Sequence, residues 1–208
     1  MYSRASGFSG RRDVTAQRIV LASASPRRRE LIARFGVPIV VALPAYDESN
    51  LSGVPESVAT EHARGKARAV RPEYRSDWIV AADTVVTYDG VVLGKPVDRS
   101  GAERMLRGLA GRTHEVITGV SVYAPHAHSC VTRFARTAVR FRPLADEEIE
   151  WYLETGEWDD AAGSYKIQGA AALFCDEIVG SYTNVVGLPL QLLYGILRTE
   201  NFTFRRSS

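Results

Sequence analysis

The chain has 208 residues, of which 45% are hydrophobic and 24% are charged, and this composition excludes a disordered or fibrous protein. Its 26 basic and 24 acidic residues leave a net charge of +2, so the composition gives no reason to expect binding to a nucleic acid polymer or a membrane. The chain has two cysteines, which are far apart and form no CxxC pair, as is typical of a protein in a reducing compartment. No apolar run approaches the roughly 18 residues of a transmembrane helix. Both features favour a cytoplasmic protein.

The sequence predicts one domain with two loose ends. Residues 1–17 are rich in Ser, Gly and Arg and lack the apolar stretch of a secretory signal, so we expect a flexible N-terminal extension. Residues 201–208 predict a loose C-terminal tail. Residues 18–200 have the length of a single domain, or of one domain with two lobes around a cleft.

Strands and helices alternate along the first half of the chain. Ser25 is typical of a helix N-cap, and Gly36 is typical of a helix end. Asp83 follows an apolar run, at the expected C-terminal end of a strand, and Asp89-Gly90 predicts a hairpin turn. The predicted order is a strand over 19–22, a helix from Pro26 to Gly36, a strand over 37–43, a helix over 56–70, and strands over 78–82 and 91–93.

The second half of the chain continues the mixture with longer strands. Asp98 is expected to cap a helix that carries an apolar stripe ending at Leu109. The remaining predictions are strands over 114–123, 130–141 and 171–179 and helices over 146–155 and 189–198. Long strands that look antiparallel argue against a purely parallel sheet, so the predicted fold class is α/β with a mixed twisted sheet and flanking helices.

The segment Ser23-Ala24-Ser25-Pro26-Arg27-Arg28 is the first candidate site. A strand leads into a helix N-terminus there, and the free N–H groups of such a terminus bind anions. Arg27 and Arg28 fall in the first helical turn, where positive charge is unfavourable to the helix. An anionic ligand bound by Ser23, Ser25 and both arginines would remove that conflict, and a solvated basic patch is the alternative.

Carboxylates and lysines form the next candidates. Asp47-Glu48 and Asp83-Thr84 could hold a hard divalent cation or activate water, or they could be a surface acidic pair and a turn. Lys66 and Lys95 could provide positive charge towards a phosphate, although a helix face accounts for Lys66 and a turn for Lys95.

A glycine-bracketed glutamine is the last candidate, and several familiar motifs are missing. Gln168 lies in Gly163-Ser164-Tyr165-Lys166-Ile167-Gln168-Gly169, and its amide could present a donor and an acceptor to a base edge, or the segment could be a plain turn. The sequence contains no Walker A motif, no GxGxxG after a strand, no HExxH and no GxSxG.

Taken together, the motifs resemble those of the Maf family, also called septum formation proteins, in collinear order over residues 18–198. The matching segments are Ser23-Ala24-Ser25-Pro26-Arg27-Arg28-Arg29-Glu30-Leu31, Asp47-Glu48, Lys66-Ala67, Ala82-Asp83-Thr84-Val85-Val86, Leu93-Gly94-Lys95-Pro96, Gly111-Arg112-Thr113-His114, Thr118-Gly119-Val120, Ile167-Gln168-Gly169 and Asn184-Val185-Val186-Gly187-Leu188-Pro189.

The resemblance implies a two-lobed fold around a nucleotide-binding cleft, similar to that of inosine triphosphatase, and pyrophosphatase activity on nucleoside triphosphates. It implies a divalent metal requirement (Mg²⁺ or Mn²⁺) and a homodimer. Glu48 and Asp83 are the candidate metal ligands because they are carboxylates, and Asp83 could act instead as the base that takes a proton from water. Asp83 matches the family's catalytic aspartate, and Glu48, Lys66 and Lys95 match cleft residues that affect activity. Arg27, Thr84 and Gln168 match family positions tied to substrate choice, and Ser23, Ser25 and Arg28 are further candidates for substrate binding.

The Ile-Gln-Gly form of the last motif resembles the branch of the family that acts on dTTP and UTP. The branch that acts on 7-methyl-GTP normally carries Glu where Gln168 stands. One departure is Ala161, where the family often has Lys. The alternatives are a 7-methyl-GTP or purine-type triphosphate pyrophosphatase, and a nucleotide-binding regulator of cell division without significant catalysis.

Overall fold

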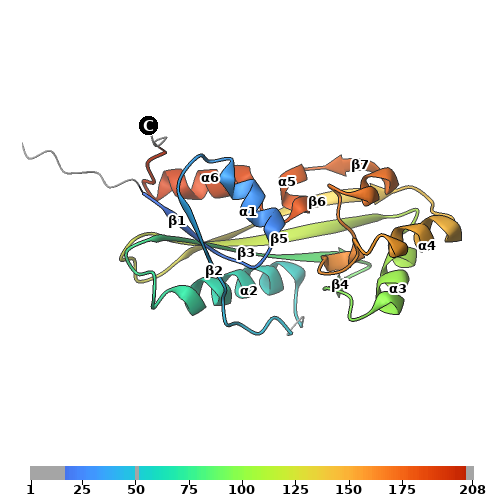
Figure 1. Cartoon of the computed structure of the whole chain (residues 1–208), viewed down its shortest axis with the longest axis horizontal. Helices are drawn as coiled ribbons and strands as arrows, with labels where there is room; N and C mark the ends of the chain where they lie inside the picture. The colour runs from blue at the N-terminus through green and yellow to red at the C-terminus, as the bar shows by residue number, and fades with distance from the viewer. Residues whose placement is uncertain (1–16, 50–51, 205–208) are drawn as a thin grey trace, which may run out of the picture.

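A mixed sheet with helices on both faces forms the fold in the computed structural model, which describes residues 17–49 and 52–204 (Figure 1). Its strands are β1 (Ile19–Ala22), β2 (Ile39–Ala42), β3 (Trp78–Tyr88), β4 (Val91–Leu93), β5 (Thr113–Tyr123), β6 (Val131–Phe141) and β7 (Cys175–Val179). Its helices are α1 (Pro26–Ala33), α2 (Pro55–Val70), α3 (Arg99–Leu109), α4 (Asp146–Glu154), α5 (Tyr182–Val186) and α6 (Leu190–Thr199), with 3₁₀ turns η1 (Ala162–Ser164) and η2 (Ala170–Phe174).

The strand order is β2-β1-β3-β5-β6-β7, and β4 lies beside the far end of β3. β1 runs parallel to β2 and β3, whereas the other pairings are antiparallel. The predicted α/β class with a mixed sheet is therefore confirmed.

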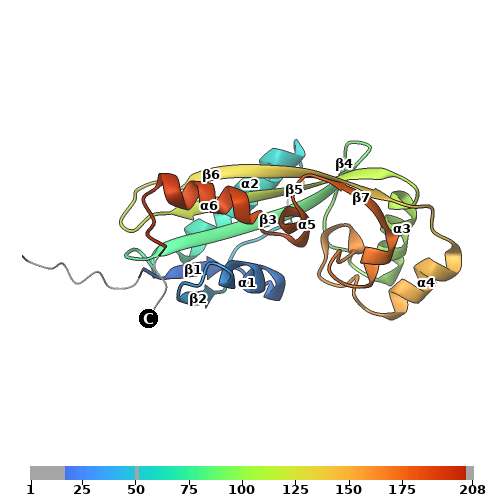
Figure 2. The ribbon, with the colours of Figure 1, turned by 90° about the horizontal axis from the view of Figure 1, so that it is seen from above.

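Three long strands, β3, β5 and β6, run the length of the molecule and carry a lobe at each end (Figures 1 and 2). At one end, a hydrophobic cluster packs β1, α1 and α6 against the sheet. At the other end, a second cluster packs α3, α4 and the 3₁₀ turns against β5 and β6. Burial of these two apolar clusters provides the main driving force for the two lobes.

Two predicted elements are corrected by the structure. The strand predicted over 78–82 continues to Tyr88, so Asp83 lies in the middle of β3 and not at its end. The charged side chain is tolerated inside the strand because it is paired with other charged groups, as described below. The strand predicted over 171–179 begins only at Cys175, because residues 170–174 form η2. The short helix α5 was not predicted.

The middle of β3 has an open edge. β1 pairs with β3 over Trp78–Val80, and β4 pairs with it over Val86–Tyr88. Along this edge, the described strands leave residues 81–85 without a backbone partner, while β5 pairs with the same residues on the other side. Asp83 and Thr84 therefore lie at the gap between the two lobes.

Gly119 brings helix α2 close to this gap. It lies opposite Asp83 on β5, and a Cβ atom at this position would lie 2.3 Å from the carbonyl oxygen of Ala59 in α2. Such a contact is shorter than real Cβ contacts, so only glycine allows the helix to pack this near the sheet. The close packing directs the buried face of α2, which carries His62 and Lys66, towards Asp83.

The structure also corrects part of the predicted loose C-terminal tail, residues 201–208. Phe202 is buried, and its ring lies 5.2 Å from that of Trp78, centroid to centroid. Phe204 packs against Phe35. Phe202 is therefore part of the hydrophobic core of the first lobe and Phe204 packs against that core. Residues 205–208, and residues 1–16 of the predicted N-terminal extension, lie outside the described residues.

Candidate active site

A cleft of about 550 Å³ lies beside the open edge of β3, between the two lobes. The strand-to-helix turn of β1–α1 forms one side, and the segments around Lys95 and Gln168 form the other. Ten of the residues singled out from the sequence line it: Ser23, Ser25, Arg27, Arg28, Glu48, Lys66, Asp83, Thr84, Lys95 and Gln168. Apart from Asp47, the structure thus brings the candidate groups to one place, although this alone assigns no role to any of them.

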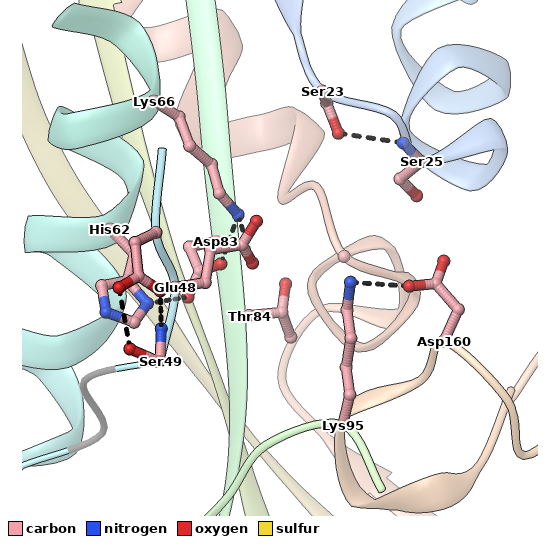
Figure 3. A network of polar contacts seen from close by, with 12 residues as sticks. Ser23, Ser25, Glu48, Ser49, His62, Lys66, Asp83, Thr84, Lys95 and Asp160 are labelled. Atoms are coloured by element: carbon pink, nitrogen blue, oxygen red, sulfur yellow. Dashed lines mark hydrogen bonds and ion pairs between the residues drawn. The ribbon is translucent and has the colours of Figure 1, made fainter. Parts of the chain in front are cut away.

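A charge network lies at the base of the cleft (Figure 3). The Lys66 ammonium contacts Oδ1 of Asp83 at 2.6 Å and Oε2 of Glu48 at 2.9 Å. Nδ1 of His62 lies 3.4 Å from the other carboxylate oxygen of Asp83. The side chains of Lys66 and Asp83 are only 5% and 8% exposed, so both charges depend on these partners rather than on water.

The surroundings keep Asp83 ionised. Burial alone raises the pKa of its carboxyl group, because a low-dielectric environment disfavours the charged form. The hydrogen bond from His62 and the positive charges of Lys66 and Arg28 act in the opposite direction and hold the pKa of Asp83 below its usual value. Asp83 is therefore a carboxylate at neutral pH, able to accept a proton or hold a cation.

Arg28 links helix α1 to the middle of β3 and to the segment after α5. Its guanidinium group donates to Oγ1 of Thr84 at 3.0 Å and to the carbonyl oxygen of Gly187 at 2.8 Å. A longer contact of 3.4 Å reaches Oγ of Ser23. Burial lowers the pKa of Arg28, and the charge of Asp83 opposes this effect. Because these bonds fix the guanidinium plane, Arg28 presents a preorganised positive charge next to Thr84.

The N-terminus of α1 has the features that its sequence predicts. Ser25 caps the helix and accepts from the backbone N–H of Arg28, and Pro26 occupies the first turn. The first turn contains no acidic residue that would offset the two arginines there. Arg27 donates to the backbone carbonyl of Asp160, on the opposite lobe, at 3.0 Å.

A second ion pair lies at the mouth of the cleft. Nζ of Lys95 contacts Oδ1 of Asp160 at 2.6 Å, and both side chains are more than half exposed (Figure 3). Burial raises the pKa of Asp160, but the hydrogen bond and charge of Lys95 outweigh it and lower the pKa overall. An exposed pair of this kind is worth little, about 0–1 kcal/mol, so Lys95 can exchange its carboxylate partner for a phosphate.

Sequence reasoning missed three neighbours of the predicted residues and misjudged a fourth. His62 shares a face of α2 with Lys66, four residues away, and this i, i+4 spacing was the signal that could have identified it. Asp160 carried no local signal, whereas Gly187 lies in the matching segment that begins at Asn184, but the motif does not reveal that its backbone carbonyl accepts from Arg28. Asp47, grouped with Glu48, is outside the residues that line the cleft and instead accepts two hydrogen bonds from Ser49.

Three features of the described chain bear on cofactors and location. Among residues 17–49 and 52–204, no three His, Cys, Asp or Glu side chains gather into a group that could hold a metal ion. No helix in the same ranges is long and apolar enough to span a bilayer. Cys130 and Cys175 are both free thiols.

The geometry separates the neighbouring arginines of α1. Arg27 lines the cleft, whereas Arg29 is exposed and is not among the lining residues. We expect Arg27→Ala to lower kcat/KM for a triphosphate about tenfold, because a charge-assisted hydrogen bond contributes roughly 1.5 kcal/mol or more. The matched change Arg29→Ala is expected to have a smaller effect. Steady-state kinetics on both variants tests this, and equal losses would contradict the geometry.

The family model of Maf-like proteins matches residues 18–200. A dTTP/UTP pyrophosphatase of Symbiobacterium thermophilum is 48% identical over 175 residues, which cover 84% of this chain and 89% of the relative. A dTTP/UTP pyrophosphatase of Geobacter sulfurreducens is 50% identical over 174 residues, covering 83% and 91%. Among solved structures, the Ham1 protein of Staphylococcus aureus has the same fold, with a TM-score of 0.51, 13% identity and coverage of 89% of this chain and 100% of that one.

Proposed function

The chain belongs to the Maf family, and from this premise we propose that it is a nucleoside triphosphate pyrophosphatase that hydrolyses dTTP and UTP to the monophosphate and pyrophosphate. The observation that carries the proposal is the convergence of all ten predicted site residues on one cleft. Chains that are nearly half identical to this one over almost their whole length carry the name dTTP/UTP pyrophosphatase, which supports the same substrates here.

The charge of the cleft suits a triphosphate. Five basic side chains line it and only three acidic ones, although the whole chain is close to neutral. The basic residues are Arg27, Arg28, Lys66, Lys95 and Lys166, and the acidic ones are Glu48, Asp83 and Asp160. Because a triphosphate carries several negative charges, these groups and the N-terminus of α1 would share them.

Hydrolysis requires water to attack the α-phosphorus. A new P–O bond forms to the water oxygen, the bond to the β-phosphate breaks, and pyrophosphate leaves with the electron pair. Asp83 is ionised and lies at the centre of the cleft, so it is suited to take the proton of the water or to hold a cation beside it. Arg28 and Lys66 stabilise the charge that develops on the phosphate oxygens, and positioning accounts for the rest.

A divalent metal ion fits the carboxylates of the cleft. Glu48 and Asp83 both contact the Lys66 ammonium, so the two carboxylates are close enough together to share a cation bound beside Lys66. Mg²⁺ commonly takes one or two protein carboxylates and completes its shell with water and phosphate oxygens, so two carboxylates without a third are sufficient. Bound there by Glu48 and Asp83, Mg²⁺ or Mn²⁺ would neutralise phosphate charge.

Gln168 is suited to select the base. It lines the cleft and is exposed, with no hydrogen bond to another described residue that would occupy its amide. The amide can donate to a carbonyl oxygen and accept from an N–H at the same time. Uracil and thymine offer this pair, whereas cytosine lacks the N3–H in its neutral form and carries an amine at position 4.

The change Gln168→Glu is expected to erode the preference for UTP over CTP. A carboxylate has no donor for the pyrimidine carbonyl, and a buried polar group left unpaired costs about 1–3 kcal/mol. The groups that hold the phosphates are untouched, so residual turnover should remain. Comparison of kcat/KM for UTP and CTP in both proteins measures the effect. An unchanged ratio would remove Gln168 from base selection.

A nucleotide panel tests the proposal as a whole. The purified chain is incubated with UTP, dTTP, CTP, 7-methyl-GTP and ITP in the presence of Mg²⁺ or Mn²⁺, and pyrophosphate and monophosphate are measured. We expect release of pyrophosphate from UTP and dTTP that depends on the metal. Faster turnover of 7-methyl-GTP or ITP would favour those alternatives, and binding without turnover would favour a regulator. The homodimer and the cytoplasmic location stay predictions.

A further inference from the structure

The segment that carries Gln168 is held at both ends through backbone N–H groups. The N–H of Lys166 donates to Oη of Tyr152 at 3.1 Å, and the N–H of Ala170 donates to Oε2 of Glu157 at 2.9 Å. Between them, the side chain of Ile167 is buried in the second hydrophobic cluster. Gln168 therefore lies at the exposed point of a short segment whose two ends are fixed.

Both attachments start from the end of helix α4. Tyr152 is a fully buried residue of this helix. Glu157 follows the helix by three residues, and its N–H donates to Oγ1 of Thr155, whose hydroxyl donates in turn to the carbonyl of Tyr152. The ring of Trp158 adds a bond to the carbonyl of Leu153. The Glu157 carboxylate is thus carried by a hydrogen-bonded turn, not by a free loop.

The Glu157 carboxylate lies directly beside the backbone of Gly169. A Cβ atom on Gly169 would lie 2.1 Å from Oε2 of Glu157, so the carboxylate occupies the space that any other side chain would need. Because Gly169 has no side chain, the carboxylate can occupy this place and accept from the N–H of Ala170. Glu157 itself is not among the described residues that line the cleft.

We propose that Glu157 is a positioning residue that determines the base selectivity of the enzyme by fixing Gln168 in the cleft, without touching the nucleotide. The inference rests on the proposed function, in which Gln168 selects uracil and thymine. Selection by one amide requires its donor and acceptor to be held within a fraction of an ångström. The charge-assisted bond from Glu157 to the residue two positions after Gln168 provides that restraint.

Two substitutions at Glu157 distinguish the effect of losing the hydrogen bond from the N–H of Ala170 from the effect of losing the negative charge of the carboxylate. Glu157→Ala removes the acceptor, whereas Glu157→Gln keeps an oxygen that can accept from the N–H of Ala170. The control is Glu154→Ala, which removes a carboxylate from an exposed position three residues earlier. For each variant, kcat and KM are measured with UTP and CTP, and the melting temperature is recorded to verify folding.

We expect Glu157→Ala to reduce the ratio of kcat/KM for UTP over CTP about tenfold, mainly through a higher KM for UTP. Glu157→Gln should retain most of the ratio, and Glu154→Ala all of it. An unchanged ratio in a folded Glu157→Ala protein would overturn the proposal. So would a melting temperature that falls with no change in selectivity, because that is the signature of a purely structural residue.

Binding measurements keep this inference distinguishable from the proposed function. The affinities of non-hydrolysable UTP and CTP analogues are measured by calorimetry for the same proteins. If the unmodified chain hydrolyses neither nucleotide but prefers the UTP analogue, and Glu157→Ala loses that preference about tenfold, the proposed activity fails and the role of Glu157 stands. If the preference survives Glu157→Ala, the role of Glu157 fails regardless of turnover.

Discussion

Replacing Asp83 with asparagine is expected to reduce turnover of nucleoside triphosphates about 100-fold or more. Asparagine keeps the size of the side chain but cannot take a proton from water and is a poor ligand for a divalent cation. Removal of a group that acts in acid–base catalysis typically costs about 100- to 10,000-fold. The effect should appear in kcat, because the phosphate-binding arginines and lysines are unchanged.

The fold should survive Asp83→Asn, because the Lys66 ammonium keeps Glu48 as a partner. Circular dichroism and a melting curve verify this before the kinetics are compared. Asp176→Asn is the matched control, since Asp176 is an exposed carboxylate on β7 that does not line the cleft. Near-normal turnover in a folded Asp83→Asn protein would remove Asp83 from the mechanism.

The parts of the fold that follow from local patterns were predictable. Some residues bond to the backbone N–H groups beside them or set the local backbone conformation, so the sequence alone indicates where a helix starts or a turn lies. Examples are the start of α1 at Ser25-Pro26, the turn at Asp89-Gly90 and the cap of α3 at Asp98. The α/β class followed in the same way from the alternation of apolar strands and helical stripes.

The extent of β3 was not predictable from local pattern alone. Asp83-Thr84 interrupts an apolar run, which is the usual sign of a strand end, yet β3 continues for a further four residues after Thr84. The charge is accommodated by Lys66 and His62, which come from a helix that precedes the strand in sequence. Only tertiary contacts decide whether a polar residue ends a strand or lies inside it.

The candidate site likewise has parts that the sequence predicts and parts that depend on tertiary contacts. Its ten residues were found through their resemblance to a family pattern, and the structure then explains why they belong together. Arg28 is an example, because neither Thr84 nor Gly187 is near it in sequence although it bonds to both. Glu157 had no signal at all, since its partner is a backbone N–H that any residue at position 170 except proline could provide.

Lys66→Met is expected to lower kcat/KM about 100-fold near neutral pH and to move the acid limb of the pH profile to higher pH. Methionine keeps the unbranched apolar stem but removes the ammonium group that contacts Asp83 and Glu48. Removal of one partner of a buried ion pair costs about 3–5 kcal/mol, and the triphosphate also loses a positive charge. Glu48 is partly exposed, so the loss of folding stability should lie at or below this range.

The direction of the pH shift follows from the surroundings of Asp83. In the unmodified protein, burial raises the pKa of this carboxyl group, and His62, Lys66 and Arg28 lower it below its usual value. Without the positive charge of Lys66, the effect of burial is less strongly opposed, so the pKa of Asp83 rises. Since the reaction needs the carboxylate, activity is lost as the pH falls through this pKa, so a higher pKa brings the loss at a higher pH.

Lys95→Met is the matched control for this prediction. Lys95 lines the same cleft, but it pairs with the exposed Asp160 and is not among the groups that shift the pKa of Asp83. Its loss should lower kcat/KM for the triphosphate at every pH and leave the acid limb where it is. Profiles of kcat/KM from about pH 5 to 9 for the three proteins, each verified as folded, measure the difference. If the acid limb of Lys66→Met coincides with that of Lys95→Met, Lys66 does not set the ionisation of Asp83, and its role is limited to binding the phosphates.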